Sequence, residues 1–151
     1  MYPITDLTKT YTTRERGTIN ALRGVDLTIA DGELVSIQGP TGGGKSTLLQ
    51  MLGGLDRPTS GTIEAFDHDL ATLDDAALTN TRAQKTGFVF QHFNLPPTLT
   101  ATENVEAAIL PINSGGKVDA HERESRALAA LDQVGLADRA THRPAELSGG
   151  Q

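Results

Sequence analysis

The sequence predicts an α/β fold, and three observations lead to that prediction. The apolar run 34–37 leads into a glycine-rich loop, and apolar residues at helical spacing follow from residue 45. Segments 25–29 and 62–66 alternate apolar with polar residues, as half-buried antiparallel strands do. Beyond two adjacent prolines, Pro96 and Pro97, the pattern becomes helical. We therefore expect a core with a parallel sheet, a small antiparallel β region and a group of helices.

The first part of the chain is expected to contain strands and a helix. Residues 25–29 form a strand, and Asp31-Gly32 turns the chain. The run 34–37 has the composition of a strand that is buried on both faces of a parallel sheet. A helix follows from Lys45 to about Leu55. This order of strand, glycine loop and helix is half of a βαβ unit.

Helix signals dominate the second half. Asp74 is a candidate N-cap for a short helix that runs to about Arg82, and residues 87–90 form a second buried strand. Thr100 and Glu103 have the spacing of a capping box for a helix through Leu110.

A charged helix is predicted between Asp119 and Gly135. The residues expected on its buried side are Ala127, Leu128, Leu131 and Val134. Ser114-Gly115-Gly116 provides a flexible link between the last two helices.

Composition excludes several functional classes. The chain has no cysteine, which rules out disulfides, thiolate catalysis and cysteine-based metal sites in these residues. Lys and Arg number 13 against 19 Asp and Glu, so a basic footprint for nucleic acid is not expected. No apolar stretch approaches the roughly 18 residues needed to cross a bilayer, and Met1-Tyr2-Pro3 does not begin a signal peptide. We expect a soluble chain with one domain.

The glycine loop matches the phosphate-binding pattern G-x-x-x-x-G-K-[ST]. Its residues are Gly39, Pro40, Thr41, Gly42, Gly43, Gly44, Lys45 and Ser46. Backbone N–H groups of such a loop can point at phosphate oxygens because no Cβ obstructs them, and the following helix adds a positive N-terminus. Lys45 would neutralise the β- and γ-phosphates, and Ser46 would ligate Mg²⁺. A plain glycine turn before an exposed lysine is the alternative, but the strand before the loop and the helix after it favour phosphate binding.

The final residues Leu147-Ser148-Gly149-Gly150-Gln151 would by themselves indicate a loop. Together with the phosphate loop they resemble the signature motif of ATP-binding-cassette (ABC) ATPases. Gln91, after the second buried strand, is similar to the Q-loop glutamine of that family, and Tyr11 stands where its adenine-stacking aromatic residue is expected.

The resemblance extends over residues 4–151. Segments 22–27, 53–61 and 88–95 look most like the branch that contains macrolide exporters, lipoprotein-release systems and cell-division proteins. It implies a partial RecA-like P-loop NTPase core with an N-terminal β region over about 1–91, a helical subdomain over about 92–147 and the signature at 147–151. All three belong to one ATP-binding domain, 1–151.

Function follows from the same resemblance. It implies an ATPase subunit that binds ATP and Mg²⁺, drives a membrane permease and works as an ATP-sandwiched homodimer at the cytoplasmic face of the membrane. Tyr11 would contact adenine, and residues Gly39 to Thr47 would contact the phosphates. Ser46 and Gln91 would surround Mg²⁺ and the attacking water, with Lys45 and Gln91 as catalytic residues. Ser148, Gly149, Gly150 and Gln151 would contact the nucleotide of the second subunit.

Family members continue past the signature into a strand with the Mg²⁺-site Asp and the catalytic Glu, and then a switch His. These residues are not found here, so we expect a C-terminally truncated chain that is inactive and poorly folded alone.

Three alternatives differ in class. A GTPase would need an Asn-Lys-x-Asp motif, which this sequence does not contain, and a chromosome-maintenance or repair ATPase would need a long insertion between the two motifs. A non-transport cassette, such as a cell-division regulator or a tandem translation factor, stays open.

Overall fold

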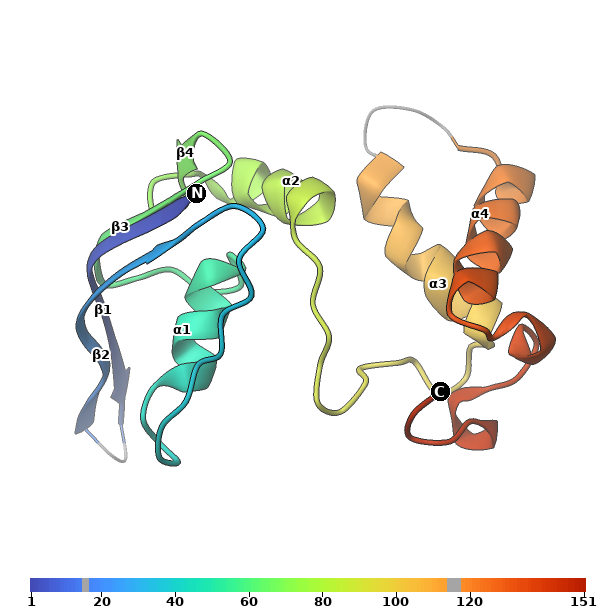
Figure 1. The fold of residues 1–151 in the computed structure, drawn as a ribbon, viewed down its shortest axis with the longest axis horizontal. Helices are drawn as coiled ribbons and strands as arrows, with labels where there is room; N and C mark the ends of the chain where they lie inside the picture. The colour runs from blue at the N-terminus through green and yellow to red at the C-terminus, as the bar shows by residue number, and fades with distance from the viewer. Residues whose placement is uncertain (15–16, 114–117) are drawn as a thin grey trace. The chain divides into compact units, whose positions relative to one another are not determined.

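The computed structural model describes residues 1–14, 17–113 and 118–151, which divide into two units, Met1–Phe88 and Val89–Gln151 (Figure 1). The predicted link at Ser114-Gly115-Gly116 lies outside the described residues. Among those described, no helix combines the length and apolar character that crossing a bilayer requires.

The first unit is built on an antiparallel sheet in the order β2-β1-β3-β4. Its strands are β1 (Tyr2–Thr13), β2 (Gly17–Ile29), β3 (Ser60–Ala65) and β4 (His68–Asp69). The two segments predicted from alternation, 25–29 and 62–66, fall in β2 and β3, apart from Phe66 just beyond β3. The antiparallel region is therefore confirmed, and strand β1 pairs along both of its edges.

Helix α1 (Lys45–Leu52) covers one face of this sheet. Its residues Leu48 and Met51 are buried with Ile4, Leu7 and Ile63 of the strands. The remaining buried members of the core are Leu22, Ala65, Leu70 and Leu78. Burial of such side chains contributes roughly 1.5–3 kcal/mol each, so this cluster holds the helix against the sheet.

Helix α1 ends at Leu52, three residues before the predicted end at Leu55. Gly54 has a φ of 65°, and the Leu55 N–H donates to the Gln50 carbonyl over 2.8 Å, which closes the helix. A Cβ on Gly53 would lie 1.8 Å from Cζ of Phe88, so the glycine also lets that ring pack on the helix end.

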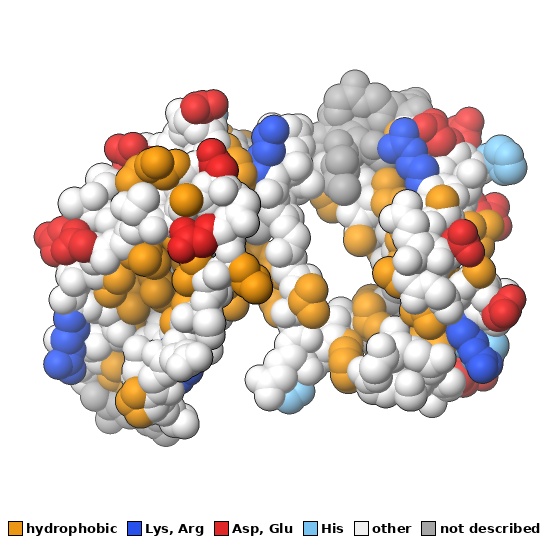
Figure 2. Space-filling model, in the orientation of Figure 1, with side chains coloured by type: hydrophobic (Ala, Val, Ile, Leu, Met, Phe, Trp, Pro, Cys, Tyr) orange, Lys and Arg blue, Asp and Glu red, His pale blue; other side chains and the backbone are white. Residues whose placement is uncertain are grey.

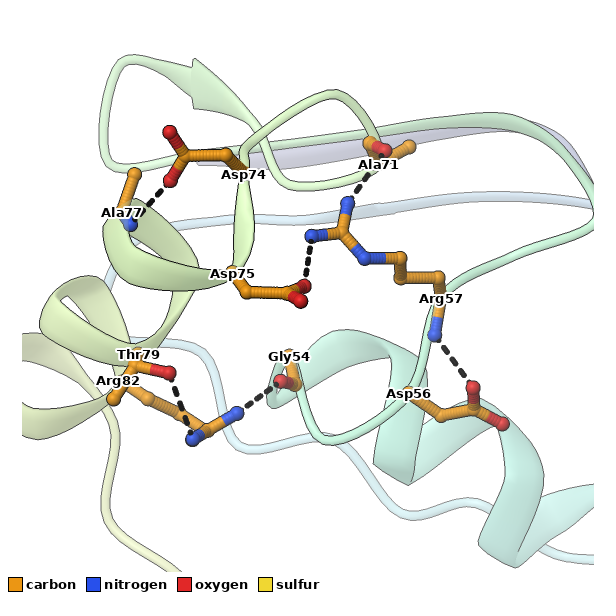
Figure 3. A network of polar contacts seen from close by, with 9 residues as sticks. All are labelled: Gly54, Asp56, Arg57, Ala71, Asp74, Asp75, Ala77, Thr79 and Arg82. Atoms are coloured by element: carbon orange, nitrogen blue, oxygen red, sulfur yellow. Dashed lines mark hydrogen bonds and ion pairs between the residues drawn. The ribbon is translucent and has the colours of Figure 1, made fainter.

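Helix α2 (Asp75–Lys85) confirms the predicted cap, because the Asp74 carboxylate accepts the Ala77 N–H at 2.7 Å. The helix continues to Lys85, one turn beyond the predicted end. Two arginines join it to the loop after α1 (Figure 3). Arg57 pairs with Asp75 at 2.8 Å, and Arg82 donates to the Gly54 carbonyl at 3.0 Å.

The two strands predicted to be buried on both faces are not formed. Segments 34–37 and 87–90 belong to no sheet of the described residues. Leu34 is 98% exposed and Val89 is fully exposed, and apolar side chains reach the surface in Figure 2. A strand needs a neighbouring strand for its ladder of backbone hydrogen bonds, and the ladders of the described residues include neither segment. The prediction of two paired core strands is wrong for this structure.

In the described residues of the second unit, the α-helices are α3 (Ala101–Ile109) and α4 (Ala120–Gln133). Short 3₁₀ segments accompany them: η1 (Leu110–Asn113), η2 (Ala137–Arg139) and η3 (Pro144–Glu146). The predicted capping box is present, because Thr100 and Glu103 each accept the backbone N–H of the other. The predicted start of α4 is also confirmed, since Asp119 accepts the Glu122 N–H at 2.8 Å.

The buried stripe of α4 is narrower than predicted. Ala127 and Leu131 are buried, whereas Leu128 is exposed and Val134 is 68% exposed. Helix α3 is the one α-helix that packs against α4 in this unit's described residues. A single neighbouring helix covers mainly positions i and i+4, which explains the exposure of Leu128, whereas Val134 lies just beyond the last residue of α4.

Candidate phosphate-binding site

The loop 39–44 leads directly into the N-terminus of α1. Gly44 is the N-cap, with a φ of 79° and no side-chain cap hydrogen bond. By contrast, α2, α3 and α4 begin at Asp74, Thr100 and Asp119, whose side chains accept N–H groups of their own helices. The first turn of α1 also carries no acidic residue. Its N–H groups and positive helix end are therefore available to an external anion.

Residue 44 must be glycine for a steric reason as well as for its positive φ. A Cβ at this position would lie 2.4 Å from the carbonyl oxygen of Ala21 in β2. Strand β2 thus closes against the start of α1, and a side chain at residue 44 would push the loop out of place.

Lys45 lies across the loop that precedes it. Its Nζ donates to the carbonyls of Gly39 at 2.8 Å and Pro40 at 2.7 Å. The Gly43 N–H donates to the same Pro40 carbonyl at 3.1 Å, which holds the loop in its turn. An ammonium group has three donors, so one remains for an anion. Lys45 is thereby held beside the uncapped end of α1.

A cavity of about 210 Å³ lies at this position. It is lined by residues 42–47 and by Ile19, Asn20 and Ala21 of β2. This volume is below the roughly 300–1,000 Å³ of a complete small-molecule pocket. The cavity therefore suits one part of a ligand, such as a phosphate chain.

A larger cavity of about 550 Å³ lies elsewhere in the same unit, near Met1 and β4. Its lining includes the carboxylates of Glu64, Asp67 and Asp69. Carboxylates repel phosphate, so the smaller cavity is the better candidate for phosphate binding although its volume is lower.

Tyr11 lies on β1 directly opposite Ile19, one of the residues that line the phosphate-loop cavity. Its hydroxyl donates to the Asp56 carboxylate at 2.8 Å, and the side chain of Thr47 lies near it. Partial burial and the neighbouring Asp56 carboxylate raise the pKa of Tyr11. The predicted adenine residue is thus beside the predicted phosphate loop.

Two residues of this neighbourhood were not predicted from the sequence, Lys9 and Asp56. The Lys9 ammonium lies 4.8 Å from the centre of the Tyr11 ring and 2.8 Å from Asp56. Lys9 and Tyr11 are two residues apart, so the period of a strand already places them on one face. Asp56 follows the glycine pair that ends α1. No local sequence pattern predicts its contact with Tyr11, which lies 45 residues earlier in the chain.

The other predicted site residues belong to the second unit. Gln91 is exposed in a turn. Ser148 to Gln151 form another exposed turn, in which the Gln151 N–H donates to the Ser148 carbonyl and the Ser148 N–H donates to the Gln151 side chain, both at 2.9 Å. A Cβ on Gly149 would lie 3.9 Å from the Phe93 ring, so the turn lies beside the segment that follows Gln91.

Comparison with known proteins gives a consistent result. The family model described as ABC transporter matches residues 22–151. An ABC transporter ATP-binding protein of Methanocaldococcus jannaschii, MJ0796, is 47% identical over all of this chain and 64% of its own length. The lipoprotein-releasing system ATP-binding protein LolD of Geobacter metallireducens is 45% identical over 98% of this chain and 64% of its own length.

Solved structures agree with the sequence relatives. A dimeric MJ0796 cassette bound to ADP and phosphate has a TM-score of 0.87 and 45% identity, and the match covers all of this chain and 65% of that one. Against three of the curated relatives, this chain spans 56%, 55% and 64% of their length. The fold class is that of an α/β P-loop NTPase cassette, and the chain belongs to the ABC transporter family.

Proposed function

We propose that these residues bind ATP and form part of an ATPase subunit that drives a membrane permease. The uncapped, glycine-started N-terminus of α1 with Lys45 across its loop carries this proposal, since it offers backbone donors and one cation to a chain of phosphates. The ABC transporter family match and the relatives named as export and lipoprotein-release proteins support the coupling to transport.

Mg²⁺ would enter together with ATP. The donor chemistry fits, because the Ser46 hydroxyl and the Gln91 side-chain oxygen are oxygen ligands, and Mg²⁺ in nucleotide sites uses few protein ligands besides phosphate and water. Bound there, the ion would neutralise charge on the phosphate oxygens. The residues of this chain would hold the phosphates still, with Lys45 on the β- and γ-phosphates and Gln91 near the attacking water.

The signature turn would serve a second subunit. Ser148, Gly149, Gly150 and Gln151 are exposed, and the two glycines let backbone approach closely. The structural neighbour is described as a dimeric cassette, which supports a dimer with ATP between the subunits. In that arrangement the helical part, about 92–147, and the signature would act together as one subdomain.

The permease would dock on the segment of about 91–106, at the cytoplasmic face of the membrane. Phe93 is 60% exposed and Leu95 is also exposed, which is unusual for two large apolar side chains in a short loop. We expect Phe93→Asp to abolish co-purification with the permease and to leave ATP binding unchanged. Val134→Asp, which also places a carboxylate at an exposed apolar residue, the C-cap of α4, is the control. Survival of the complex in Phe93→Asp would contradict this assignment.

Phosphate release by the complete subunit with its permease tests the function as a whole. We expect turnover that requires Mg²⁺ and is lost in Ser46→Ala, while a Ser125→Ala control on the solvent face of α4 keeps it. Turnover that is equal with and without Mg²⁺ would contradict the proposal.

A further inference from the structure

We propose that Asp56 is a positioning residue for the nucleotide base, acting with Lys9 to fix the ring of Tyr11 beside the phosphate loop. This inference rests on the proposed function, because it assigns a role in the same ATP site. It goes beyond that function by naming what holds the aromatic residue in place.

Both oxygens of the Asp56 carboxylate are used. Oδ2 accepts the Tyr11 hydroxyl at 2.8 Å, and Oδ1 accepts Lys9 Nζ at 2.8 Å and the backbone N–H of Arg57 at 2.7 Å. Figure 3 shows the Arg57 N–H directed at Asp56, while the guanidinium group of Arg57 turns away to Asp75 and the carbonyl of Ala71. The backbone of its own loop therefore fixes the position of the Asp56 carboxylate, and this carboxylate in turn accepts the Tyr11 hydroxyl.

Lys9 fixes the ring from a second direction. Its Nζ donates to Asp56 and to the Arg57 carbonyl at 2.6 Å, and lies 4.8 Å from the centre of the Tyr11 ring. The side chain of Lys9 is 12% exposed and that of Asp56 is 33% exposed, so water screens the pair only in part. An ammonium on one ring face leaves at most the opposite face for a base.

The contacts join three parts of the site. Tyr11 lies on β1, Asp56 follows the end of α1, and Thr47, whose side chain lies near the Tyr11 hydroxyl, belongs to the first turn of α1. A ring held at its hydroxyl and on one face loses little rotational freedom when a base stacks on it, and such preorganisation strengthens binding. The base and the phosphates would therefore meet a single rigid unit.

A double-mutant cycle on the complete subunit tests this inference, with ATP and inorganic tripolyphosphate as the probes. We expect Asp56→Ala to weaken ATP by about fivefold or more, as Tyr11→Ala does, and to leave tripolyphosphate affinity unchanged. The double variant should bind ATP no more weakly than Tyr11→Ala alone. Asp75→Asn, which removes a carboxylate that does not touch Tyr11, is the matched control and should change neither affinity.

A spectroscopic readout reports on the Tyr11 hydroxyl directly and does not depend on ATP affinity. With ¹³Cζ-labelled tyrosine, the Tyr11 resonance is identified by its loss in Tyr11→Phe, and its titration midpoint should fall in Asp56→Asn. Additive effects of Asp56→Ala and Tyr11→Ala on ATP, equal weakening of ATP and tripolyphosphate, or an unchanged Tyr11 titration would each overturn the inference. Failure of the unsubstituted subunit to bind either probe would instead overturn the proposed function, and the inference with it.

Discussion

At the scale of single residues, the candidate site depends on positions where glycine has no substitute. Gly44 has a left-handed φ of 79°. A Cβ at this residue would also lie 2.4 Å from the carbonyl oxygen of Ala21. Lys45 reaches back over the loop that this glycine closes. The motif predicted both residues from the sequence, because a close backbone approach and a phosphate-facing cation are local requirements.

Gly44→Ala should destabilise the first unit by about 1–3 kcal/mol, because alanine tolerates neither the backbone conformation nor the contact with β2. ATP affinity should fall as well, since the loop must shift. Urea unfolding and calorimetry of ATP binding measure the two effects. Gly87→Ala is the control, because a Cβ there meets nothing within 4 Å. Equal stability of the two variants would contradict this account of the loop.

The Asp56 network predicts a pH dependence of stability. Burial acts to raise the pKa of Asp56, but hydrogen bonds from Lys9, Tyr11 and the Arg57 backbone outweigh it and hold that pKa below its ordinary value. A lowered carboxyl pKa stabilises the fold above the unfolded pKa of about 4, and this stabilisation disappears as pH falls through the folded pKa. For Tyr11, whose pKa is raised, the contribution is present below about pH 10 and lost above it.

We therefore expect the free energy of unfolding to decrease between about pH 5 and pH 2, and Asp56→Asn to flatten that decrease. Denaturant titrations over this range measure it. Asp75→Asn serves as the comparison, because its 98% exposed side chain makes one ion pair outside the network. The same slope in Asp56→Asn and the parent protein would be the contrary result.

At the scale of elements, local sequence signals were enough to predict where helices begin, but not to predict which segments form buried strands. Caps at Asp74, Thr100 and Asp119 lie where the sequence predicted them, because a cap is decided by residues three positions apart. Segments 34–37 and 87–90 have the composition of buried strands, yet strand formation depends on a partner strand that can be distant in the sequence. Composition alone does not identify that partner.

Thr100→Ala should remove half of the capping box of α3 and cost about 1 kcal/mol of stability in the second unit. Hydrogen exchange of the first-turn amides of α3 measures this effect locally. In Ser125→Ala, a hydroxyl is removed from the solvent face of α4, so these amides should exchange as in the parent protein. Unchanged protection in Thr100→Ala would show that tertiary contacts, and not the cap, determine where α3 begins.

At the scale of the whole molecule, the sequence predicted the family and the class of fold, but not the packing of each part. The phosphate loop, Tyr11, Gln91 and the signature are local patterns that can be read in order. The contacts of Lys9 and Asp56, and the exposure of Leu128 and Val134, depend on which elements lie against one another. Such contacts follow from the three-dimensional arrangement and have no signature along the chain.

Residues 1–151 expressed alone should behave as a loosely folded protein. The exposed apolar side chains include Leu34 and Val89, which favour dye binding and association. We expect 8-anilinonaphthalene-1-sulfonate fluorescence and a broad calorimetric transition, with less dye bound in Leu34→Lys/Val89→Lys. A sharp, cooperative transition without dye binding would contradict this expectation.

Calorimetry of ATP binding to Lys45→Ala tests the central claim most directly. Lys45 is the cation held beside the uncapped start of α1, so its loss should weaken ATP by at least about tenfold, or about 1.4 kcal/mol, in the complete subunit. Lys85→Ala, at the C-terminal end of α2, should bind ATP like the unsubstituted protein. Equal ATP affinity of Lys45→Ala and the unsubstituted protein would show that residues 39–46 are not the phosphate site.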